Sequence, residues 1–500
     1  MASETVLASG PISRVERAAY RPSNREDCYQ HLSAYFDSFA PSRDKWRKTN
    51  SGYHAEVLRM YRYHIPEGAR VLEVGCATGD LLAALKPAYG LGVDLSEEMV
   101  KAASKKYSQL RFEHASIEEY AAGSKVEKFD YIVLSDLLAF AYDILDVFKA
   151  LRALCHARTR IIINIYSRLW EPLLALAEST GMKYRQPALN WVTVNDVRDL
   201  LGLANLEVIS TNSRIICPVN AGVLSRFANS VIAPFSPFRW FCLSNWIVAR
   251  MPMVLAAEPA RQSSVTVVCP CRNEAGNIPH VVSRLQQMGS NTELIFVEGH
   301  SKDETLAACH KVKADHPELD ISVYQQSGKG KKDAVWLGFE KAKGDILMIL
   351  DADLTVPPED LPAFYGAIVS GQAEFVNGSR FVYPMEGKAM RFLNLFGNKF
   401  FSFVFSSLIE QNVKDTLCGT KVLLRTDYQR LAAGRGYFGN FDPFGDFDLL
   451  FGAAKLSLKI SDLPIRYRDR MYGETQIQRF RHGWMLLKMC GVGLVRLRMR

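Results

Sequence analysis

The 500-residue sequence lacks the patterns that define several classes of protein. Its ten cysteines are scattered, with no Cys-x-x-Cys pair and no matching histidine cluster, so a zinc site is not expected. No stretch reaches about 18 uninterrupted apolar residues, so no transmembrane helix is predicted. The start, MASETVLASGPISRVE, has no basic segment followed by an apolar core, so no secretory signal is predicted. Reduced thiols in a cytosolic protein fit these absences.

Acidic residues are scarce near the C-terminus. Residues 466–500 carry most of the net charge of +8, and their Lys and Arg side chains alternate with Tyr, Phe, Trp, Leu and Met. No motif that reads duplex DNA is present, so nucleic acid is not an expected partner. This composition suits an anionic membrane surface or a phosphate-bearing substrate, and the alternative is a solvated basic tail.

Short apolar strands alternate with helical stretches twice along the chain, which predicts two α/β domains. A composition of 48% hydrophobic and 23% charged residues excludes a disordered chain or a coiled coil. The predicted divisions are an N-terminal lead-in or lid of polar, irregular chain (1–50), a doubly wound α/β domain (51–217), an apolar linker (218–262), a second α/β domain (263–475) and a basic amphipathic tail (476–500). The linker is expected to pack as a strap between the domains, with contact to a membrane as the alternative.

The first domain contains a glycine-rich turn in VLEVGCATGD. A strand ends at Val74, and the chain turns through Gly75 and Gly79 into a helix that begins near Asp80. Glycine permits close backbone approach, and the helix start presents unpaired N–H groups to a ligand. Asp94 ends the next strand, about 20 residues on, where an acid can hold ribose hydroxyls. The alternative interpretation is structural: the glycines only form the strand-to-helix turn, and Asp94 only caps the following helix.

Together with Glu73 before the turn and FDYIVLSD ending in Asp136, this stretch resembles the class I S-adenosylmethionine-dependent methyltransferases over roughly 50–215. The resemblance implies a Rossmann-like fold and S-adenosylmethionine as cofactor. It includes Glu73 among the cofactor-binding residues. It places Gly75, Cys76 and Gly79 at the methionine part, Asp94 at the ribose, Ser116 and Ile117 at the adenine edge and Asp136 on the acceptor side. A dinucleotide site is the competing interpretation, but the G-x-G-x-x-G pattern is absent.

The second domain carries paired acids at the end of a buried strand. Residues 345–351 form this strand in DILMILDADLTVPPEDL, and Asp351 and Asp353 lie at its exit. Two carboxylates there are costly unless a cation compensates them. Mg²⁺ prefers oxygen ligands and binds through one or two carboxylates plus substrate phosphates. The alternative is a charged loop in which Asp353 caps the following turn.

Further motifs follow the neighbouring strands of this domain. TVVCPCRNEAGNI, ELIFVEGHSKDET and GKGKKDAVWLGF each place polar residues after a strand or at a helix start. The residues assigned to a nucleotide-sugar are Pro270, Arg272, Asn273, Glu274, Glu298, Asp303, Lys329, Asp333, Asp351 and Asp353. Ser301 and Glu304 also fit a capping box, so part of that signal is helix initiation.

These motifs resemble the family 2 inverting glycosyltransferases of the GT-A fold over 263 to about 475. The segments FVNGSRF and PIRYRDRMYGETQIQRF are similar to those of dolichol- or polyprenyl-phosphate sugar synthases. The resemblance implies Mg²⁺ or Mn²⁺ on Asp351 and Asp353, and Asp333 near the base. It puts Arg380, Arg468 and Arg470 near the acceptor phosphate. The usual D-D-G-S segment is replaced here by Glu298, Gly299, His300 and Ser301.

The sequence permits two kinds of sugar acceptor, a phosphate or a hydroxyl. A phosphate monoester is largely ionised at pH 7 and needs electrostatic holding, for which clustered arginines, Arg380 among them, are suited. A hydroxyl acceptor needs a base, and Asp446 and Asp448 stand where the wider family keeps one. The sequence therefore predicts a bifunctional enzyme at the cytoplasmic face of a membrane that transfers sugar to polyprenyl phosphate and O-methylates a glycan. The alternative is transfer to a glycan or protein hydroxyl, beside a non-catalytic methyltransferase-like scaffold.

Overall fold

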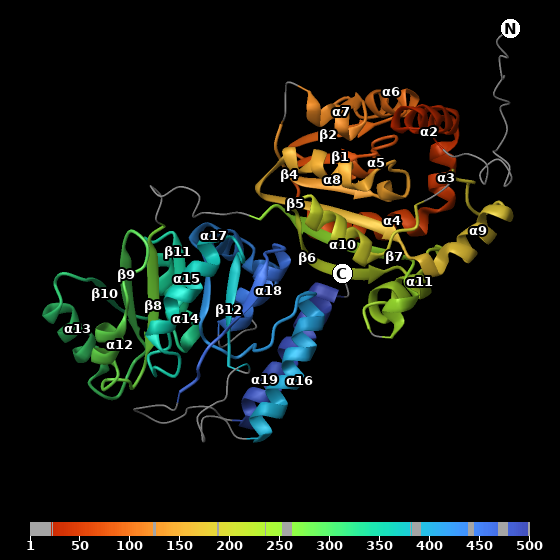
Figure 1. Cartoon of the computed structure of the whole chain (residues 1–500). Helices are drawn as coiled ribbons and strands as arrows, with labels where there is room; N and C mark the ends of the chain where they lie inside the picture. Colours follow the sequence, from red (N-terminus) through yellow and green to blue (C-terminus); the bar gives the residue numbers. More distant parts are fainter. Residues whose placement is uncertain are drawn as a thin grey trace, which may run out of the picture. The chain divides into compact units, whose positions relative to one another are not determined.

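The computed structural model describes residues 22, 24–123, 127–187, 190–235, 237–252, 263–380, 382, 392–438, 445–468 and 479–498. The chain divides into two compact units, Met1–Pro252 with Met499–Arg500, and Met253–Arg498. Each unit contains one seven-stranded sheet (Figure 1). Two mixed α/β units are therefore present, as the sequence predicts.

The sheet of the first unit has the strand order β3-β2-β1-β4-β5-β7-β6. Its strands are β1 (Arg70–Val74), β2 (Tyr89–Asp94), β3 (Arg111–His114), β4 (Phe129–Ser135), β5 (Cys155–Tyr166), β6 (Glu207–Arg214) and β7 (Ser244–Arg250). The first five strands in this order, β3, β2, β1, β4 and β5, run parallel. The carboxyl ends of β1, β2 and β4 therefore meet at one edge of the sheet. Central strands such as β1 are buried on both faces because helices cover both sides of the sheet.

Strand β7 lies inside the segment predicted as an apolar linker. It pairs antiparallel with both β5 and β6, and Trp246 and Ile247 are buried in the sheet. The described residues up to 252 thus belong to the first unit, and 253–262 lie outside the described residues. The strand was missed because the Pro- and Phe-rich composition around NWIVAR obscures a short run of β-branched residues.

Helices fill the connections and precede the first strand. They are α2 (Arg25–Phe39), α3 (Arg43–Thr49), α4 (Ser51–His64), α5 (Asp80–Ala84), α6 (Glu97–Lys106), α7 (Ile117–Ala122), α8 (Ile144–Ala153), α9 (Glu171–Ser179), α10 (Val194–Leu203) and α11 (Val223–Phe227). Short 3-10 turns occur at Ala40–Ser42, Leu137–Ala139, Arg168–Trp170 and Phe238–Phe241, and a π turn occurs at Ala228–Ile232.

The expectation of irregular chain before residue 50 is wrong for the described part. The Asn24 side chain accepts a hydrogen bond from the Asp27 amide and so caps α2. Leu32 and Tyr35 are buried on the inner face of this helix, and α3 follows directly. Burial of one apolar face stabilises a helix whose composition alone is polar. Residues 1–21 lie outside the described residues.

The second unit has a sheet of order β10-β9-β8-β11-β13-β12-β14. Its strands are β8 (Val265–Cys271), β9 (Thr292–Glu298), β10 (Asp320–Gln325), β11 (Ile346–Ile349), β12 (Phe375–Ser379), β13 (Lys421–Leu424) and β14 (Ile460–Pro464). Strands β10, β9, β8 and β11 are parallel, and β13 is antiparallel to β11 and β12. The motifs after β8, β9 and β11 therefore share one sheet edge.

The helices of the second unit are α12 (Ile278–Arg284), α13 (Thr305–Asp315), α14 (Lys331–Lys341), α15 (Leu361–Val369), α16 (Phe392–Ile409), α17 (Arg425–Ala433), α18 (Asp446–Lys455) and α19 (Arg479–Gly493). Helix α19 packs beside α16, and a π turn at Leu494–Arg498 follows it (Figure 1). Arg498 is buried, and its Nη1 lies 2.6 Å from Glu410 Oε1. This cation of the predicted basic tail is therefore neutralised within the unit.

Within the described part of the chain, none of the helices combines the length and apolar composition needed to cross a bilayer.

Candidate active sites

A cavity of about 670 Å³ opens in the first unit, at the carboxyl edge of the sheet. Strands β1, β2 and β4 supply one wall, and α2, α3 and α4 supply another. The predicted cofactor residues that line it are Glu73, Gly75, Cys76, Asp94, Ser116, Ile117 and Asp136. The fold therefore brings together residues that lie far apart in the sequence. Gly79 is the predicted residue that does not line this cavity.

The two glycines have different roles. Both adopt positive φ, +73° at Gly75 and +74° at Gly79. A Cβ at Gly79 would lie 2.6 Å from Phe112 Cζ, so a side chain here would collide with the ring. Gly79 thus serves the turn into α5, whereas Gly75 presents its backbone to the cavity.

Asp94 is the last residue of β2, and backbone amides hold both oxygens of its carboxylate in place. Oδ2 accepts a hydrogen bond from the Ala77 amide at 2.7 Å, and Oδ1 accepts one from the Ser96 amide at 2.9 Å. Burial raises the pKa of Asp94, while these two amides favour its ionised form. Each oxygen keeps a lone pair for a further donor, such as a ribose hydroxyl.

Glu73 and Ser116 both line the cavity, and each also accepts a hydrogen bond from a backbone amide at the start of a helix. Glu73 Oε2 accepts a hydrogen bond from the Leu82 amide at 2.9 Å, in the first turn of α5. Burial raises the pKa of Glu73 to about 8. The Ser116 hydroxyl accepts from the Glu119 amide, and Glu119 Oε2 accepts from the Ser116 amide, which makes a capping box. Ser116 therefore has a structural role as the N-cap of α7, and any contact with a ligand would come in addition to it.

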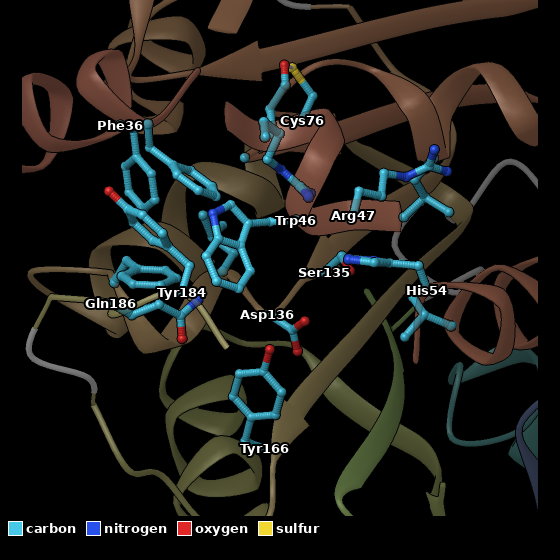
Figure 2. A pocket seen from close by; sticks show the side chains of 18 of the residues that line it. Phe36, Trp46, Arg47, His54, Cys76, Ser135, Asp136, Tyr166, Tyr184 and Gln186 are labelled. Carbon is cyan, nitrogen blue, oxygen red and sulfur yellow. Dashed lines mark hydrogen bonds between the residues drawn. The ribbon is translucent and has the colours of Figure 1, made fainter. Parts of the chain in front are cut away.

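Asp136 lies at the end of β4 in a buried hydrogen-bond network. Tyr53 donates its hydroxyl to Oδ2 at 2.7 Å, and the Asn164 side-chain amide donates to Oδ1 at 2.6 Å. Tyr166 points its hydroxyl toward the same carboxyl group (Figure 2). Asp136 adopts a left-handed φ of 56°, a conformation that carries strain for residues other than glycine.

Burial raises the pKa of Asp136 to about 6, although hydrogen bonds from Tyr53 and Tyr166 favour its ionised form. A carboxyl group with this pKa exchanges protons near neutral pH. The side chain is thus suited to accept a proton from a substrate hydroxyl.

An aromatic wall in the cavity escaped the sequence reasoning. Phe39 and Tyr184 stack with ring centroids 4.2 Å apart, and Trp46 meets Tyr184 edge-on at 5.6 Å. Phe36 contacts Phe140 at 5.3 Å. Figure 2 shows Phe36, Trp46 and Tyr184 grouped on one side of the cavity. The spacing of three between Phe36 and Phe39 is the signal that could have indicated a common helix face.

Cationic and neutral basic groups from α3 and α4 also face the cavity. Arg47 pairs with Asp80 at 3.3 Å, whereas Arg43 lines the cavity and burial lowers its pKa. Burial, reinforced by these two guanidinium groups, lowers the pKa of His54 to about 3, so His54 is neutral at physiological pH. The cavity therefore offers positive charge to an anionic group of a ligand.

In the second unit, Asp351 and Asp353 follow β11 as predicted. Asp353 Oδ1 accepts hydrogen bonds from the Thr355 amide at 3.1 Å and from its hydroxyl at 2.8 Å. Lys331 Nζ, at the start of α14, lies 2.7 Å from Asp351 Oδ1 and 3.9 Å from Asp446 Oδ1. Burial alone would lower the pKa of Lys331, but these two carboxylates raise it. A cation therefore already stands beside the paired acids.

The acids of the predicted nucleoside site hold two loops together. Glu298 Oε2 accepts a hydrogen bond from the Gln325 amide group at 2.9 Å, and its Oε1 accepts from the Ser301 amide. Asp303 accepts from the Ala275 amide at 3.3 Å. Burial opposes ionisation of both acids, but these hydrogen bonds lower the pKa of each below its usual value.

The remaining predicted residues of this site lie on the same edge or close to it. Asn273 Oδ1 accepts from the Lys302 amide, and Glu274 Oε2 accepts from the Asn277 side chain at 2.6 Å. Arg272 and Lys329 are exposed, and Pro270 lies within β8. Asp333 accepts from the Lys329 amide at 2.9 Å and so fixes the loop before α14.

Backbone strain gathers at this edge, which the sequence did not reveal. Asn273, His300 and Leu354 all have left-handed φ values, between 55° and 59°, in the loops that follow β8, β9 and β11. Such conformations persist where the surrounding structure enforces them, and they are frequent at ligand sites.

The residues predicted at the acceptor side are largely engaged within the unit. Arg380 makes a bidentate pair with buried Asp415, at 2.6 and 2.8 Å. Asp448 Oδ2 lies 3.0 Å from Arg435 Nε, and Arg435 stacks on Trp336 at 3.7 Å. Burial raises the pKa of Asp448, and Arg435 opposes that rise.

The two other predicted acceptor residues differ in what the structure describes. The Arg468 backbone amide donates to the Thr355 carbonyl at 3.0 Å, which ties this segment to the Asp353 loop. Arg470 lies outside the described residues.

The donor set at β11 fits a hard divalent cation. It contains carboxylate oxygens only, and among the described residues no group of three or more His, Cys, Asp or Glu gathers for a metal. Asp351 and Asp353 alone would therefore hold Mg²⁺ or Mn²⁺ incompletely, and a diphosphate would complete the oxygen shell.

Comparison with known proteins finds one similar family for each unit. Residues 72–161 match the family model described as a methyltransferase domain, and residues 266–431 match glycosyl transferase family 2. Two separate segments of the chain are therefore similar to known transferase domains, the first to a methyltransferase domain and the second to glycosyl transferase family 2.

Individual relatives share parts of the chain. The dolichol-phosphate mannosyltransferase of Pyrococcus furiosus is 34% identical over 24% of this chain and 33% of its own length. The undecaprenyl-phosphate 4-deoxy-4-formamido-L-arabinose transferase of Aeromonas hydrophila is 33% identical over 21% and 34%. The chain thus spans about a third of the length of these relatives. The magnesium protoporphyrin IX methyltransferase of Synechocystis PCC 6803 with bound SAH aligns at 18% identity and a TM-score of 0.32, over 45% of this chain and 99% of that structure.

Proposed function

We propose that the chain is a bifunctional enzyme of surface-glycan synthesis. Its second unit would transfer a sugar from a nucleotide diphosphate to polyprenyl phosphate, with inversion and with Mg²⁺ or Mn²⁺. Its first unit would methylate a hydroxyl with S-adenosylmethionine. One observation carries this proposal. The chain contains two separate sheets, and acidic residues gather at the carboxyl edge of each, among them Asp94 and Asp136 in the first unit and Asp353 in the second.

The first unit supports methyl transfer through Asp94 and Asp136. S-adenosylmethionine would supply an electrophilic methyl group on a sulfonium sulfur. The Ala77 and Ser96 amides fix the orientation of the Asp94 carboxylate, which would accept hydrogen bonds from the ribose hydroxyls through its remaining lone pairs. The acceptor oxygen would bond to the methyl carbon as the carbon–sulfur bond breaks, and Asp136 would take up the proton of the acceptor hydroxyl. S-adenosylhomocysteine is the second product.

The second unit supports sugar transfer through Asp351 and Asp353. These carboxylates would hold the metal, which neutralises charge on the leaving diphosphate. Lys331 would give up its contact with Asp351 when the metal and donor enter, and it would remain near the diphosphate. Direct in-line attack on the anomeric carbon inverts its configuration.

A phosphate acceptor is favoured over a hydroxyl. Asp448 is already paired with Arg435, which leaves Asp446 as the acid beside Lys331. A phosphate oxygen is ionised and needs no base. The names of the two curated relatives above both specify a polyprenyl-type phosphate acceptor. Arg468 and Arg470 would bind this phosphate, and the Arg380–Asp415 pair would position the segment around it.

Contact with a membrane follows from a lipid acceptor. Phe403 on α16 and Trp484 on α19 are strongly exposed, although these two helices pack together. Aromatic side chains of this kind favour the lipid–water interface. We therefore place the enzyme peripherally, at the cytoplasmic face of the membrane.

The test is transfer of labelled sugar from UDP-, GDP- and dTDP-sugars, with Mg²⁺ or Mn²⁺, into polyprenyl phosphate that is extracted into organic solvent. Label in the organic phase supports the proposal. Donor hydrolysis with an empty organic phase would contradict the lipid acceptor. Calorimetric titration with S-adenosylmethionine tests the first unit, and no heat of binding would leave it as a scaffold.

A further inference from the structure

Exposed apolar side chains gather on two segments of the first unit. Helix α9 has the sequence EPLLALAES, yet none of its residues is buried. Residues 219–235 and 237–241 expose Val223, Leu224, Phe227, Phe238, Trp240 and Phe241. The exposed fraction is 84% at Val223, 77% at Leu224 and 75% at Trp240. Solvent-exposed apolar surface on this scale marks an interaction site. We call these two segments the cavity rim.

The two segments of the cavity rim adjoin each other. Trp170, immediately before α9, donates its indole N–H to the Phe241 carbonyl at 2.9 Å. Figure 1 shows α9 and α11 on the same side of the first unit. The apolar side chains therefore form one surface.

The cavity rim borders the opening of the methyltransferase-type cavity. Leu173 and Leu176 of α9 line the cavity and are more than half exposed, so they stand at its mouth. Val219 lines the cavity as well and is exposed. A Cβ at Gly52 would lie 2.7 Å from the Pro218 carbonyl, so this segment packs closely on the start of α4, next to Tyr53.

The 219–241 segment of the cavity rim carries arginine and no acidic residue. No Asp or Glu stands between Glu207 and Glu258, whereas Arg226 is exposed and Arg239 is partly exposed. On α9, Glu178 pairs with Lys183 at 2.8 Å, and exposed Glu171 is close in sequence to exposed Arg168. Tryptophan and phenylalanine beside arginine, with little acid, match an anionic lipid surface better than a basic or strongly charged protein partner.

We propose that the cavity rim docks on an anionic lipid bilayer, so that the cavity opens toward the membrane and receives a lipid-linked acceptor. This inference rests on the proposed methyltransferase function and names the class of its substrate. The acceptor is a hydroxyl on a sugar carried by a lipid phosphate, which is the chemical class of product that the second unit would make. The aromatic wall of Phe39, Trp46 and Tyr184 supplies flat apolar surface for a sugar ring.

The docking is tested with the full chain and vesicles that contain phosphatidylglycerol. Phospholipid brominated on the acyl chains should quench part of the tryptophan fluorescence, and Trp240→Phe should remove that part. Trp484→Phe is the matched variant on α19 and should leave the Trp240 contribution in place. Equal quenching of wild type and Trp240→Phe would overturn the inference.

Affinity is tested by vesicle flotation of Leu224→Ser/Phe227→Ser/Trp240→Ser. Burying one such side chain is worth about 1.5–3 kcal/mol, so binding should weaken about tenfold or more. Leu203→Ser removes a similarly exposed leucine that lies outside the cavity rim and should bind as wild type. Self-association that the triple variant abolishes, without vesicle binding, would instead identify a second copy as the occupant and overturn the inference.

Methyl transfer separates this inference from the proposed function. The triple variant should bind S-adenosylmethionine like wild type, because its residues do not line the cavity, but should lose methyl transfer to lipid-linked sugar in vesicles. If wild type does not bind S-adenosylmethionine at all, the proposed function fails. If wild type binds it and the triple variant methylates the vesicle substrate at the normal rate, only the inference fails.

Discussion

The two units use the same sheet edge in opposite ways. In the first unit, acids such as Asp94 and Asp136 line a cavity and have raised pKa values because burial dominates. In the second unit, Asp351, Asp415 and Asp448 each face a Lys or Arg of the same chain. In the first site, Asp94 and Asp136 are thus held by hydrogen bonds from backbone amides and neutral side chains. The second holds its acids in ion pairs, which a metal and a diphosphate would have to rearrange.

The largest expected effect tests proton acceptance in the first unit. Asp136→Asn should lower methyl transfer by about 10²–10⁴-fold while S-adenosylmethionine still binds. Because the carboxylate must be ionised to accept a proton, wild-type activity should rise with pH through about 6 and then level. Rates measured across this pH range provide the check. Asp143→Asn, in the exposed N-cap of α8, is the control, and a wild-type pH profile in Asp136→Asn would contradict the role.

The next effect tests the metal in the second unit. Asp353→Asn removes one of two carboxylates and should reduce sugar transfer by more than about a hundredfold, since a bound metal supplies several kcal/mol of charge stabilisation. EDTA should abolish the same activity and leave methyl transfer intact. Asp315→Asn, an exposed acid at the end of α13, serves as the control. Full sugar transfer in EDTA would refute the metal assignment.

A smaller effect concerns cofactor affinity. Asp94→Ala removes a charged hydrogen-bond acceptor and should weaken S-adenosylmethionine binding about 10- to 100-fold by calorimetry. Sugar transfer should be unchanged because Asp94 belongs to the first unit. The exposed Asp146→Ala should bind normally. Unchanged affinity in Asp94→Ala would exclude the proposed ribose contact.

The smallest expected effect separates structure from chemistry at Asp448. Asp448→Asn breaks the buried pair with Arg435 and should cost about 1–3 kcal/mol in the free energy of unfolding, measured with denaturant. Its kcat for sugar transfer should stay within a few-fold of wild type. A large loss of kcat without loss of stability would restore Asp448 as the catalytic base of a hydroxyl acceptor.

Local sequence was enough to place the strands and turns that carry both sites. A buried apolar run that ends in glycine or aspartate is defined by a few neighbouring residues, as at Val74–Gly75 and at Asp351. Gly75 and Gly79 adopt the positive φ that favours glycine, and the family models match segments of both predicted domains. Strand β7 and helix α2 were less predictable, because pairing with β5 and β6 and burial of Leu32 stabilise them rather than local composition.

The partners of each charged group depended on the tertiary structure. The sequence predicts Arg380 as a phosphate ligand. In the structure, however, Arg380 forms a bidentate pair with Asp415, which lies 35 residues away in the sequence. Tyr53 and Asn164 contact Asp136 although they lie 83 residues before it and 28 residues after it in the sequence. The sequence by itself determined the two α/β domains and the residues at their sheet edges, since hydrophobic period and turn chemistry are local. Only the fold decided which acids are buried, paired or open to a ligand, because pKa and charge compensation depend on neighbours that are distant in the chain.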